Sequence, residues 1–303
     1  MINDKILIFG YGSIAIKHKK FLTKLYPKKK IFIYSKRKIK IKNRINKLED
    51  ILLIKPKHVI ICSNTKNHFK DLIFFENNFK KINILVEKPL FDKIYNYKFK
   101  NNKIFVGYNL RFDPIMQFIK NKIRNKKIWV ANIMCGSYLP NWRKNIKYYK
   151  TYSSKKNQGG GVVLDLSHEF DYATWFFGKL SKKFSLIDKV SNLKINSEDY
   201  CNFYGSAKRC KHISIYLDYF SRIPYRLIFL KGKNFFLKAN LLKKKITYFE
   251  NNKHKVFKHN SSNYDYSYLA QLRNFISFNG KNLSCYNDGL RVLKIISEIK
   301  KNL

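Results

Sequence analysis

A glycine-rich turn near the N-terminus, Gly10-Tyr11-Gly12-Ser13-Ile14-Ala15, constrains the fold of this chain more than any other feature. An apolar run of strand length, Lys5–Phe9, precedes it, and a helical pattern over Ser13–Tyr26 follows it. In this order the first glycine permits a tight turn, and the second lets backbone N–H groups approach a pyrophosphate. The helix N-terminus adds unpaired N–H donors and a positive dipole end. The turn therefore predicts a dinucleotide site with these contacts: Gly10, Gly12, Ser13 and Ile14.

An ordinary strand-to-helix turn would give the same glycine match, so the flanking pattern decides. Short apolar runs alternate with helical patterns from residue 1 to about residue 118, and the second run follows the glycine turn at βαβ distance. This alternation predicts a parallel sheet covered on both faces, with ligands beyond the carboxyl ends of its strands. The expected strands are Lys5–Phe9, Ile31–Tyr34, His58–Cys62, Ile82–Val86 and Ile104–Val106, and the expected helices are Ser13–Tyr26, Lys66–Asn77 and Pro114–Arg124.

The end of the second expected strand bears on the cofactor. NAD-binding sites usually carry Asp or Glu there for the ribose hydroxyls, whereas this chain has Ser35-Lys36-Arg37. A hydroxyl followed by two cations suits the 2′-phosphate of NADP, which Arg37 could bind in bidentate fashion. Basic residues are common throughout this chain, so the missing carboxylate is the stronger half of the argument. We expect NADP, with NAD as the alternative.

Two further strands end in polar residues that would face the same ligand. Ser63, Asn64 and His68 follow the third strand, and we place them beside the cofactor, although such a histidine more often contacts backbone. Glu87-Lys88-Pro89 follows the fourth strand, and the proline fixes a turn that would aim the Lys88 amine into the cleft. Desolvation beside a cationic ring would lower the pKa of that amine and make it usable for proton transfer. One lysine among many is the competing interpretation.

Composition limits the partners. The 303 residues include 63 Lys and Arg against 19 Asp and Glu, a formal net charge of +44. The lysines occur in expected strands, helices and loops alike rather than in one stripe, so we attribute the charge to compositional bias and expect no nucleic-acid partner. With no signal peptide, no apolar run of about 18 residues and five scattered cysteines, we expect a cytoplasmic protein without membrane or metal sites.

The most informative stretch outside the glycine turn is Gly159–Gly178, which reads as three glycines and one helix ending at a glycine C-cap. At about 100° per residue, Val162, Leu166 and Phe170 share an apolar face. A second stripe carries carboxylate, imidazole and phenol groups, which suits acid–base work, although a capped surface face would look similar. The members of this stripe are Asp165, His168, Glu169 and Tyr172.

The remainder reads as a second domain over residues 119–303, after a first domain over residues 1–118. It has a strand at Lys127–Gly136, a basic aromatic loop at Asn141–Ser154, and successive strands from Lys183 to Glu250. In the loop, Trp142 could stack on a sugar and Arg143 could hold an acidic group, although the loop could equally pack on its own aromatic residues. Helices are expected at Tyr264–Asn279 and Asn287–Asn302.

Four stretches together resemble the Gfo/Idh/MocA family of NAD(P)-dependent sugar and cyclitol oxidoreductases. They are Gly10–Ala15, Glu87-Lys88-Pro89, Gly107–Phe112 and Gly159–Gly178, in family order and spacing across the whole chain. The resemblance implies a cis bond before Pro89 and an α/β fold class. It implies a Rossmann domain followed by an α+β domain with a large, open-faced, mainly antiparallel sheet, on which homodimers or homotetramers form.

The resemblance also assigns roles. It places the catalytic lysine at Lys88, with His168 as the partner acid–base and Asp165 orienting it or hydrogen-bonding the substrate. The family spacing puts histidine four residues after the aspartate, where this chain has Glu169, so either histidine or glutamate could fill that role. Glu87 and Lys88 are expected to contact cofactor, and the expected substrate contacts are Asn109, Arg111, Trp142, Arg143, Glu169 and Tyr172.

The implied activity is hydride transfer between nicotinamide and a sugar. The form Asp-Leu-Ser-His-Glu-x-Asp resembles a branch associated with bacterial surface-sugar pathways, so we expect an activated or acidic sugar. A non-catalytic nucleotide-binding protein that retains the fold is the alternative. The sequence leaves open which sugar, which carbon, which direction of reaction and what oligomer size.

Overall fold

The computed structural model describes residues 4–143, 145–259, 265–277 and 280–301. By their contacts these residues divide into two compact units. Unit 1 comprises Met1–Phe112 and Tyr264–Gly289, and unit 2 comprises Asp113–Asn263 and Leu290–Leu303. Among the described residues, no helix is both long and apolar enough to cross a membrane. The boundary between two domains at residue 118 stays a prediction.

Unit 1 is built on a seven-stranded sheet, sheet A, which is the Rossmann-like sheet expected from the glycine turn. Its strand order is β15-β6-β5-β4-β1-β2-β3, and every pair is parallel except β15 with β6. The strands are β1 (Ile6–Phe9), β2 (Ile31–Tyr34), β3 (Arg44–Ile45), β4 (His58–Ile61), β5 (Asn83–Val86), β6 (Lys103–Val106) and β15 (Ser284–Cys285).

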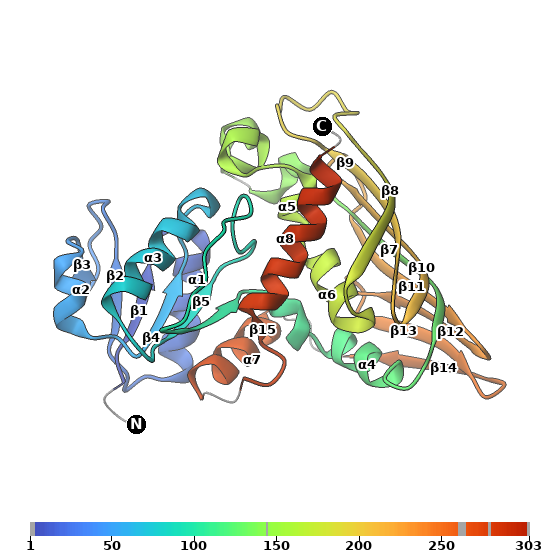
Figure 1. The fold of residues 1–303 in the computed structure, drawn as a ribbon, viewed down its shortest axis with the longest axis horizontal. Coiled ribbons are helices and arrows are strands. Elements are labelled where there is room, and N and C mark those ends of the chain that lie inside the picture. The colour runs from blue at the N-terminus through green and yellow to red at the C-terminus, as the bar shows by residue number, and fades with distance from the viewer. Residues whose placement is uncertain (1–3, 144, 260–264, 278–279, 302–303) are drawn as a thin grey trace. The chain divides into compact units, whose positions relative to one another are not determined.

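Helices cover both faces of sheet A because its strands are apolar on both sides (Figure 1). On one face, α1 (Ser13–Leu25) and α7 (Asp265–Ile276) form a core with Ile6, Ile8 and Ile60. On the other face, α3 (His68–Asn78) brings Phe75 against Phe9 of β1. The sequence missed three short elements here: β3, β15 and α2 (Glu49–Ile54).

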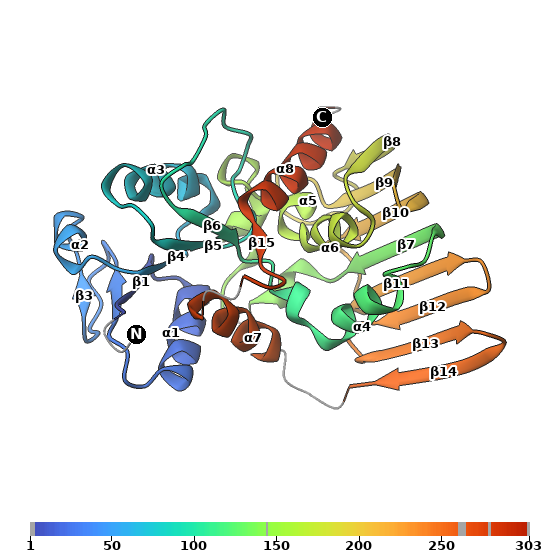
Figure 2. The ribbon, with the colours of Figure 1, turned by 60° about the horizontal axis from the view of Figure 1, so that its bottom comes forward.

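Unit 2 is built on an eight-stranded sheet, sheet B, with the order β14-β13-β12-β11-β7-β10-β9-β8 (Figure 2). All pairs are antiparallel except β7 with β10, so the mainly antiparallel second sheet is confirmed. The strands are β7 (Ile128–Gly136), β8 (Leu180–Asp188), β9 (Tyr200–Ala207), β10 (Cys210–Asp218), β11 (Tyr225–Gly232), β12 (Phe235–Asn240), β13 (Lys245–Glu250) and β14 (Lys253–Lys258).

Sheet B has one covered face and one open face. In β10, Ile213, Ile215 and Leu217 are buried while Ser214 and Tyr216 between them are partly exposed, as their alternation predicts. Two short helices contact the covered side, α5 (Val162–Asp165) and α6 (His168–Phe177). The open side has a shallow cavity of about 550 Å³ lined by residues of β7, β9, β10, β11 and β12. Two further helices among the described residues are α4 (Pro114–Lys122) and α8 (Tyr286–Lys300).

The single helix expected after the three glycines was wrong, because the chain forms two helices there. Helix α5 ends at Asp165, and α6 begins at His168. Between them, Ser167 N–H bonds the Leu164 carbonyl and Glu169 N–H bonds the Leu166 carbonyl, three residues back instead of four. Asp165 therefore does not share one helical stripe with His168, Glu169 and Tyr172. The expected ends of the last two helices at residues 264, 278, 279 and 302 lie outside the described residues.

Candidate functional site

Three turns meet at one edge of sheet A because they follow neighbouring parallel strands. The glycine turn follows β1, Ser63 and Asn64 follow β4, and Glu87-Lys88-Pro89 follows β5. Backbone bonds attach two of these turns to the ends of neighbouring strands: Gly10 N–H donates to Tyr34 O of β2 at 3.0 Å, and Glu87 N–H donates to Ile61 O of β4 at 2.9 Å. The carboxyl edge of a parallel sheet is where this type of fold binds ligands.

The glycine turn fits a pyrophosphate. Gly10 has φ +104°, and a Cβ there would lie 2.9 Å from the backbone of Cys62 and Ser63. Gly12 has φ −104° and precedes α1, and a Cβ on it would meet nothing within 4 Å. The space above Gly12 is therefore open to a ligand, which the N–H groups of the following first turn, at Ser13 and Ile14, can approach.

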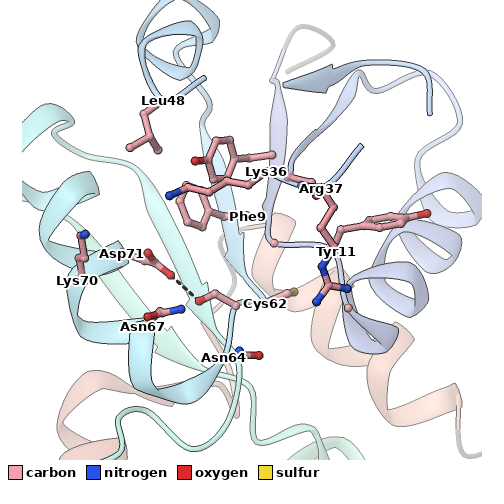
Figure 3. Close-up of a pocket in the computed structure, with 15 residues that line it drawn as sticks. Phe9, Tyr11, Lys36, Arg37, Leu48, Cys62, Asn64, Asn67, Lys70 and Asp71 are labelled. Carbon is pink, nitrogen blue, oxygen red and sulfur yellow. Dashed lines mark hydrogen bonds between the residues drawn. The ribbon is translucent and has the colours of Figure 1, made fainter. Parts of the chain in front are cut away.

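A cavity of about 360 Å³ opens beside this turn (Figure 3). Its lining is drawn from the ends of β1, β2 and β4 and from the first turn of α3. Eight of its residues were not expected from sequence, although the helix start after a third strand is a signal that could have indicated some of them. The lining residues are Phe9, Gly10, Tyr11, Gly12, Tyr34, Ser35, Lys36, Arg37, Leu48, Cys62, Ser63, Asn64, Asn67, Lys70 and Asp71.

Ser35-Lys36-Arg37 lines this cavity as predicted for a phosphate-binding turn. The Ser35 hydroxyl accepts the Arg37 N–H at 3.1 Å, so it shapes the turn that carries both cations. Lys36 and Arg37 are exposed, and Figure 3 shows their side chains extending in different directions. No carboxylate follows directly after β2, which is the sequence feature behind the NADP prediction.

Asp71 places one carboxylate deeper in the cavity. The Ser63 hydroxyl donates to it at 2.5 Å, which is the dashed line in Figure 3. Burial raises the pKa of Asp71, while the Ser63 hydrogen bond and nearby cations oppose that rise. Ser63 is thereby held by Asp71, and Asn64 beside it is exposed at the rim.

The Lys88 turn follows β5, and the bond between Lys88 and Pro89 is cis, as the resemblance implied. The Lys88 side chain is half-buried. His68, expected at the cofactor, instead packs under this turn: Nδ1 lies 3.0 Å from Pro89 O, and Nε2 lies 3.0 Å from Ser63 O. The ring is only 1% exposed and contacts backbone carbonyl oxygens, which is the alternative interpretation given for this histidine.

Asn109 and Arg111, both expected at the substrate, are buried within unit 1. Asn109 Nδ2 donates to Ser267 Oγ at 2.7 Å, and Arg111 Nη1 lies 3.0 Å from Asp288 Oδ2. These bonds attach the short 3-10 helix Asn109–Phe112 to the C-terminal segment of the unit. Their geometry is that of structural contacts, and their role at a substrate stays a prediction.

In unit 2, Asp165 is the centre of a buried aromatic cluster. Tyr219 Oη donates to Asp165 Oδ2 at 2.6 Å, and the charge of Asp165 raises the pKa of Tyr152, which also hydrogen-bonds it. Burial, followed by the same carboxylate, raises the pKa of Tyr219. Both phenols therefore stay protonated and donate to Asp165, and the orienting of His168 by Asp165 stays a prediction.

Glu169 is committed to an ion pair. Its side chain has no exposed surface, and Arg226 Nε and Nη2 donate to its two oxygens at 2.6 and 3.1 Å. Tyr172 is also fully buried, and its hydroxyl donates to Glu169 Oε1 at 3.4 Å. This geometry favours a structural role for Glu169 and Tyr172 over the predicted substrate contacts. His168, at the start of α6, keeps 9% of its surface exposed.

The loop over residues 141–154 packs partly on its own aromatic residues, as the alternative interpretation had it. Trp142 Nε1 donates to Ser137 Oγ at 2.9 Å, and its ring meets Tyr219 edge-on. The Arg143 guanidinium lies 5.3 Å from the Tyr152 ring centroid. Both side chains remain partly exposed. In the described part of the chain, no group of three His, Cys, Asp or Glu residues is placed to hold a metal ion.

No protein-family model and no curated protein matches the sequence significantly. Solved structures match its fold along nearly its whole length. An oxidoreductase from Agrobacterium radiobacter, in complex with NAD+, L-tartaric acid and magnesium, is 14% identical with a TM-score of 0.82, covering 99% of this chain and 97% of that one. The WlbA dehydrogenase from Bordetella pertussis, in complex with NADH and UDP-GlcNAcA, is 14% identical with a TM-score of 0.74, covering 99% and 96%.

A super-repressor mutant of Gal80p from Saccharomyces cerevisiae also matches, at 14% identity and a TM-score of 0.78, covering 99% of this chain and 95% of that one. The structural neighbours are of the Gfo/Idh/MocA type. The fold expected from the four sequence stretches is therefore confirmed: this chain has the two-part architecture of NAD(P)-dependent oxidoreductases.

Proposed function

We propose that this protein is a nicotinamide-dependent oxidoreductase acting on a sugar. The observation that carries the proposal is the meeting of a pyrophosphate-shaped turn and a half-buried lysine at one edge of sheet A. Bound nicotinamide would supply the chemistry by accepting or giving a hydride at a carbinol or ketone carbon. The chain's own residues would bind the dinucleotide, hold the sugar and move the hydroxyl proton.

In this proposal Lys88 exchanges the hydroxyl proton or polarises the carbonyl, and His168 is the partner acid–base. The Arg226 pair supports His168 over Glu169 for that role, because a carboxylate bound at both oxygens is a poor proton carrier. Asp165 would hold Tyr152 and Tyr219 in place and so shape the aromatic loop that meets the sugar.

The proposed cofactor is NADP, with NAD as the alternative. The Ser35-Lys36-Arg37 turn offers two cations and no carboxylate where the 2′-phosphate would lie. Fluorescence titration with NADPH and NADH tests this directly. Arg37→Ala should weaken NADPH binding at least about tenfold and leave NADH binding nearly unchanged, since one charge-assisted pair is worth ~1.5–3 kcal/mol. Equal losses for both cofactors would remove the assignment to the 2′-phosphate.

The proposed substrate class is a nucleotide-linked or acidic sugar. One structural neighbour was solved with UDP-GlcNAcA, and the strongly basic surface of this chain would attract an anionic sugar at low salt. A screen of UDP-linked sugars, uronic acids and neutral sugars, followed by NADPH absorbance, would distinguish these classes.

Replacing Lys88 by alanine is the decisive test of the mechanism. Loss of a proton-transfer group should lower turnover by about 100-fold or more, while NADPH still binds at the glycine turn. Lys66→Ala, at an exposed position in the same unit, is the matched control. Native turnover in Lys88→Ala would exclude the proposed role.

A non-catalytic nucleotide-binding protein is the second candidate. The commitment of Asp165 and Glu169 to Tyr219 and Arg226 favours it, because two of the expected polar groups serve the fold instead. The likeness to a repressor mutant shows that this architecture is not confined to proteins described as enzymes. This candidate predicts NADPH binding without redox change in every arm of the sugar screen.

A further inference from the structure

A buried contact joins helix α1 to the turn that carries Lys88. His18, on the inner face of α1, has no exposed surface, and its Nε2 lies 2.6 Å from Glu87 Oε1. Glu87 is itself only 7% exposed. Glu87 was expected at the cofactor, and its carboxylate contacts His18, a residue with no predicted role.

The contact has a defined direction. The second oxygen of Glu87, Oε2, lies 3.3 Å from the Lys88 N–H, which can only donate. A carboxylate in this position is an acceptor on both sides, so the proton between Glu87 and the ring belongs to His18 Nε2. Among the residues that the structure describes, His18 Nδ1 has no hydrogen-bond partner, so the contact with Glu87 is made through Nε2 alone.

The surroundings leave this pair little freedom. A Cβ on Gly107 would lie 3.0 Å from Glu87 Oε1, so the absence of a side chain there makes room for the carboxylate. On its other side the His18 ring meets Tyr268 of α7 edge-on, with centroids 6.0 Å apart. The adjacent Lys17 pairs with Asp265 at 3.1 Å, which fixes the same turn of α1 against α7.

We infer that His18 is a positioning residue for Lys88. Through Glu87 it holds the backbone N–H of Lys88 at the start of the turn, while His68 holds the carbonyls of Pro89 and Leu90 at its end. The helix whose N-terminus faces the pyrophosphate is thereby linked to the backbone that aims the amine. Dinucleotide binding and the orientation of Lys88 are mechanically coupled through one hydrogen bond.

This inference rests on the proposed role of Lys88. Its test therefore measures the chemical reactivity of the Lys88 amine and not turnover. Trace acetylation with acetic anhydride, followed by peptide mass spectrometry, gives the labelling rate of Lys88 relative to the exposed Lys66 in the same sample. His18→Leu removes the donor and retains an apolar side chain, whereas His18→Gln keeps an N–H donor near the Nε2 position.

In His18→Leu we expect the loosened turn to expose Lys88, so its labelling rate should rise about threefold or more. In His18→Gln the rate should stay near that of the native chain, and NADP+ should protect Lys88 in the native chain and in His18→Gln more than in His18→Leu. Phe21→Leu, one turn along the same buried face of α1, is the control for altered packing and should leave the rate unchanged.

Equal rates in His18→Leu and the native chain, or equal increases in His18→Leu and His18→Gln, would overturn the inference. Should His18→Leu fail to fold, ¹⁵N chemical shifts of the native histidines decide instead: His18 should carry its proton on Nε2, and a bare Nε2 would overturn the inference. If Lys88 responds as expected yet no sugar is turned over, the positioning stands and the proposed enzymatic function fails.

Discussion

Gly10 and Gly12 lie two residues apart in one turn, yet the structure imposes different demands on them. Gly10 has φ +104°, which residues with a side chain rarely adopt, and an added Cβ would clash with the backbone that follows β4. We expect Gly10→Ala to lower the free energy of unfolding by at least about 2 kcal/mol, measured by urea titration, and to abolish NADPH binding.

Gly12→Ala should weaken cofactor binding while leaving the free energy of unfolding nearly unchanged. Its φ of −104° suits any residue, and the added methyl meets no protein atom, so the free energy of unfolding should change by less than about 0.5 kcal/mol. NADPH binding should still weaken at least about tenfold, because the methyl occupies the space that a pyrophosphate needs. Native affinity in this variant would show that the dinucleotide does not lie on this turn.

His58, buried in β4 against Phe275, gives the fold a pH dependence of its own. Burial lowers its pKa to about 4, from 6.5 in an unfolded chain. Between these values the unfolded chain binds more protons, so the free energy of unfolding should fall by up to about 3 kcal/mol as pH drops from about 6.5 to 4. Urea titrations at several pH values should show this loss reduced in His58→Leu and retained in His254→Leu, at an exposed position.

The role of a residue could be predicted from the sequence only where the indicating pattern lies in the residues next to it. The glycine turn, the basic turn after β2 and the Glu87-Lys88-Pro89 turn could be read from sequence because each lies at the end of an apolar run. The partners of the polar residues could not be read. Glu87 with His18, Asp165 with Tyr219, and Glu169 with Arg226 are contacts between distant segments, which only the packed sheets bring together.

At the scale of elements, α6 is attached to β11 by the Glu169–Arg226 pair. Arg226→Met would leave the fully buried carboxylate without its cation, so we expect the free energy of unfolding to fall by about 3–5 kcal/mol. The double variant Glu169→Leu, Arg226→Met should recover part of that loss. A substrate-binding Glu169 predicts the opposite result, with stability unchanged and only the sugar KM raised.

The break between α5 and α6 shows why periodicity alone mistook two helices for one. Leu166 leaves the helical region (φ −95°, ψ 29°), whereas Ser167 keeps helical angles (φ −64°, ψ −11°). The hydrogen bonds shorten to three residues while the apolar residues remain nearly in phase. The apolar face was thus correctly placed, but the polar groups before and after the break point to different partners.

At the scale of the whole molecule, the open side of sheet B favours self-association, which we propose as a homodimer. Phe184 and Leu186 of β8 are exposed on this side, beside Tyr204 and Asn202 of β9. Light scattering should show a dimer in the native chain, a monomer in Phe184→Lys, Leu186→Lys, and no change in Ile223→Lys, which lies in a loop.

Charge gives that association a characteristic salt dependence. Two copies that each carry a formal net charge of +44 repel one another. At 0.1 M salt this repulsion is screened between charges more than about 10 Å apart. The dimer should therefore tighten as salt rises, as sedimentation at several salt concentrations would show. A dimer that weakens with salt would point to ion pairs in place of the apolar strands.

The parallel sheet and the mainly antiparallel sheet were predictable because burial imposes a different residue pattern on each. No local pattern indicates that the chain returns to pack with unit 1 after unit 2. Residues 265–277 and 280–289 pack with unit 1, where Leu272, Phe275, Ile276 and Leu283 complete the core beneath α1. The polypeptide therefore passes between the units three times. No single cut in the chain releases unit 1 intact, so unit 1 cannot be exchanged between proteins as one continuous segment.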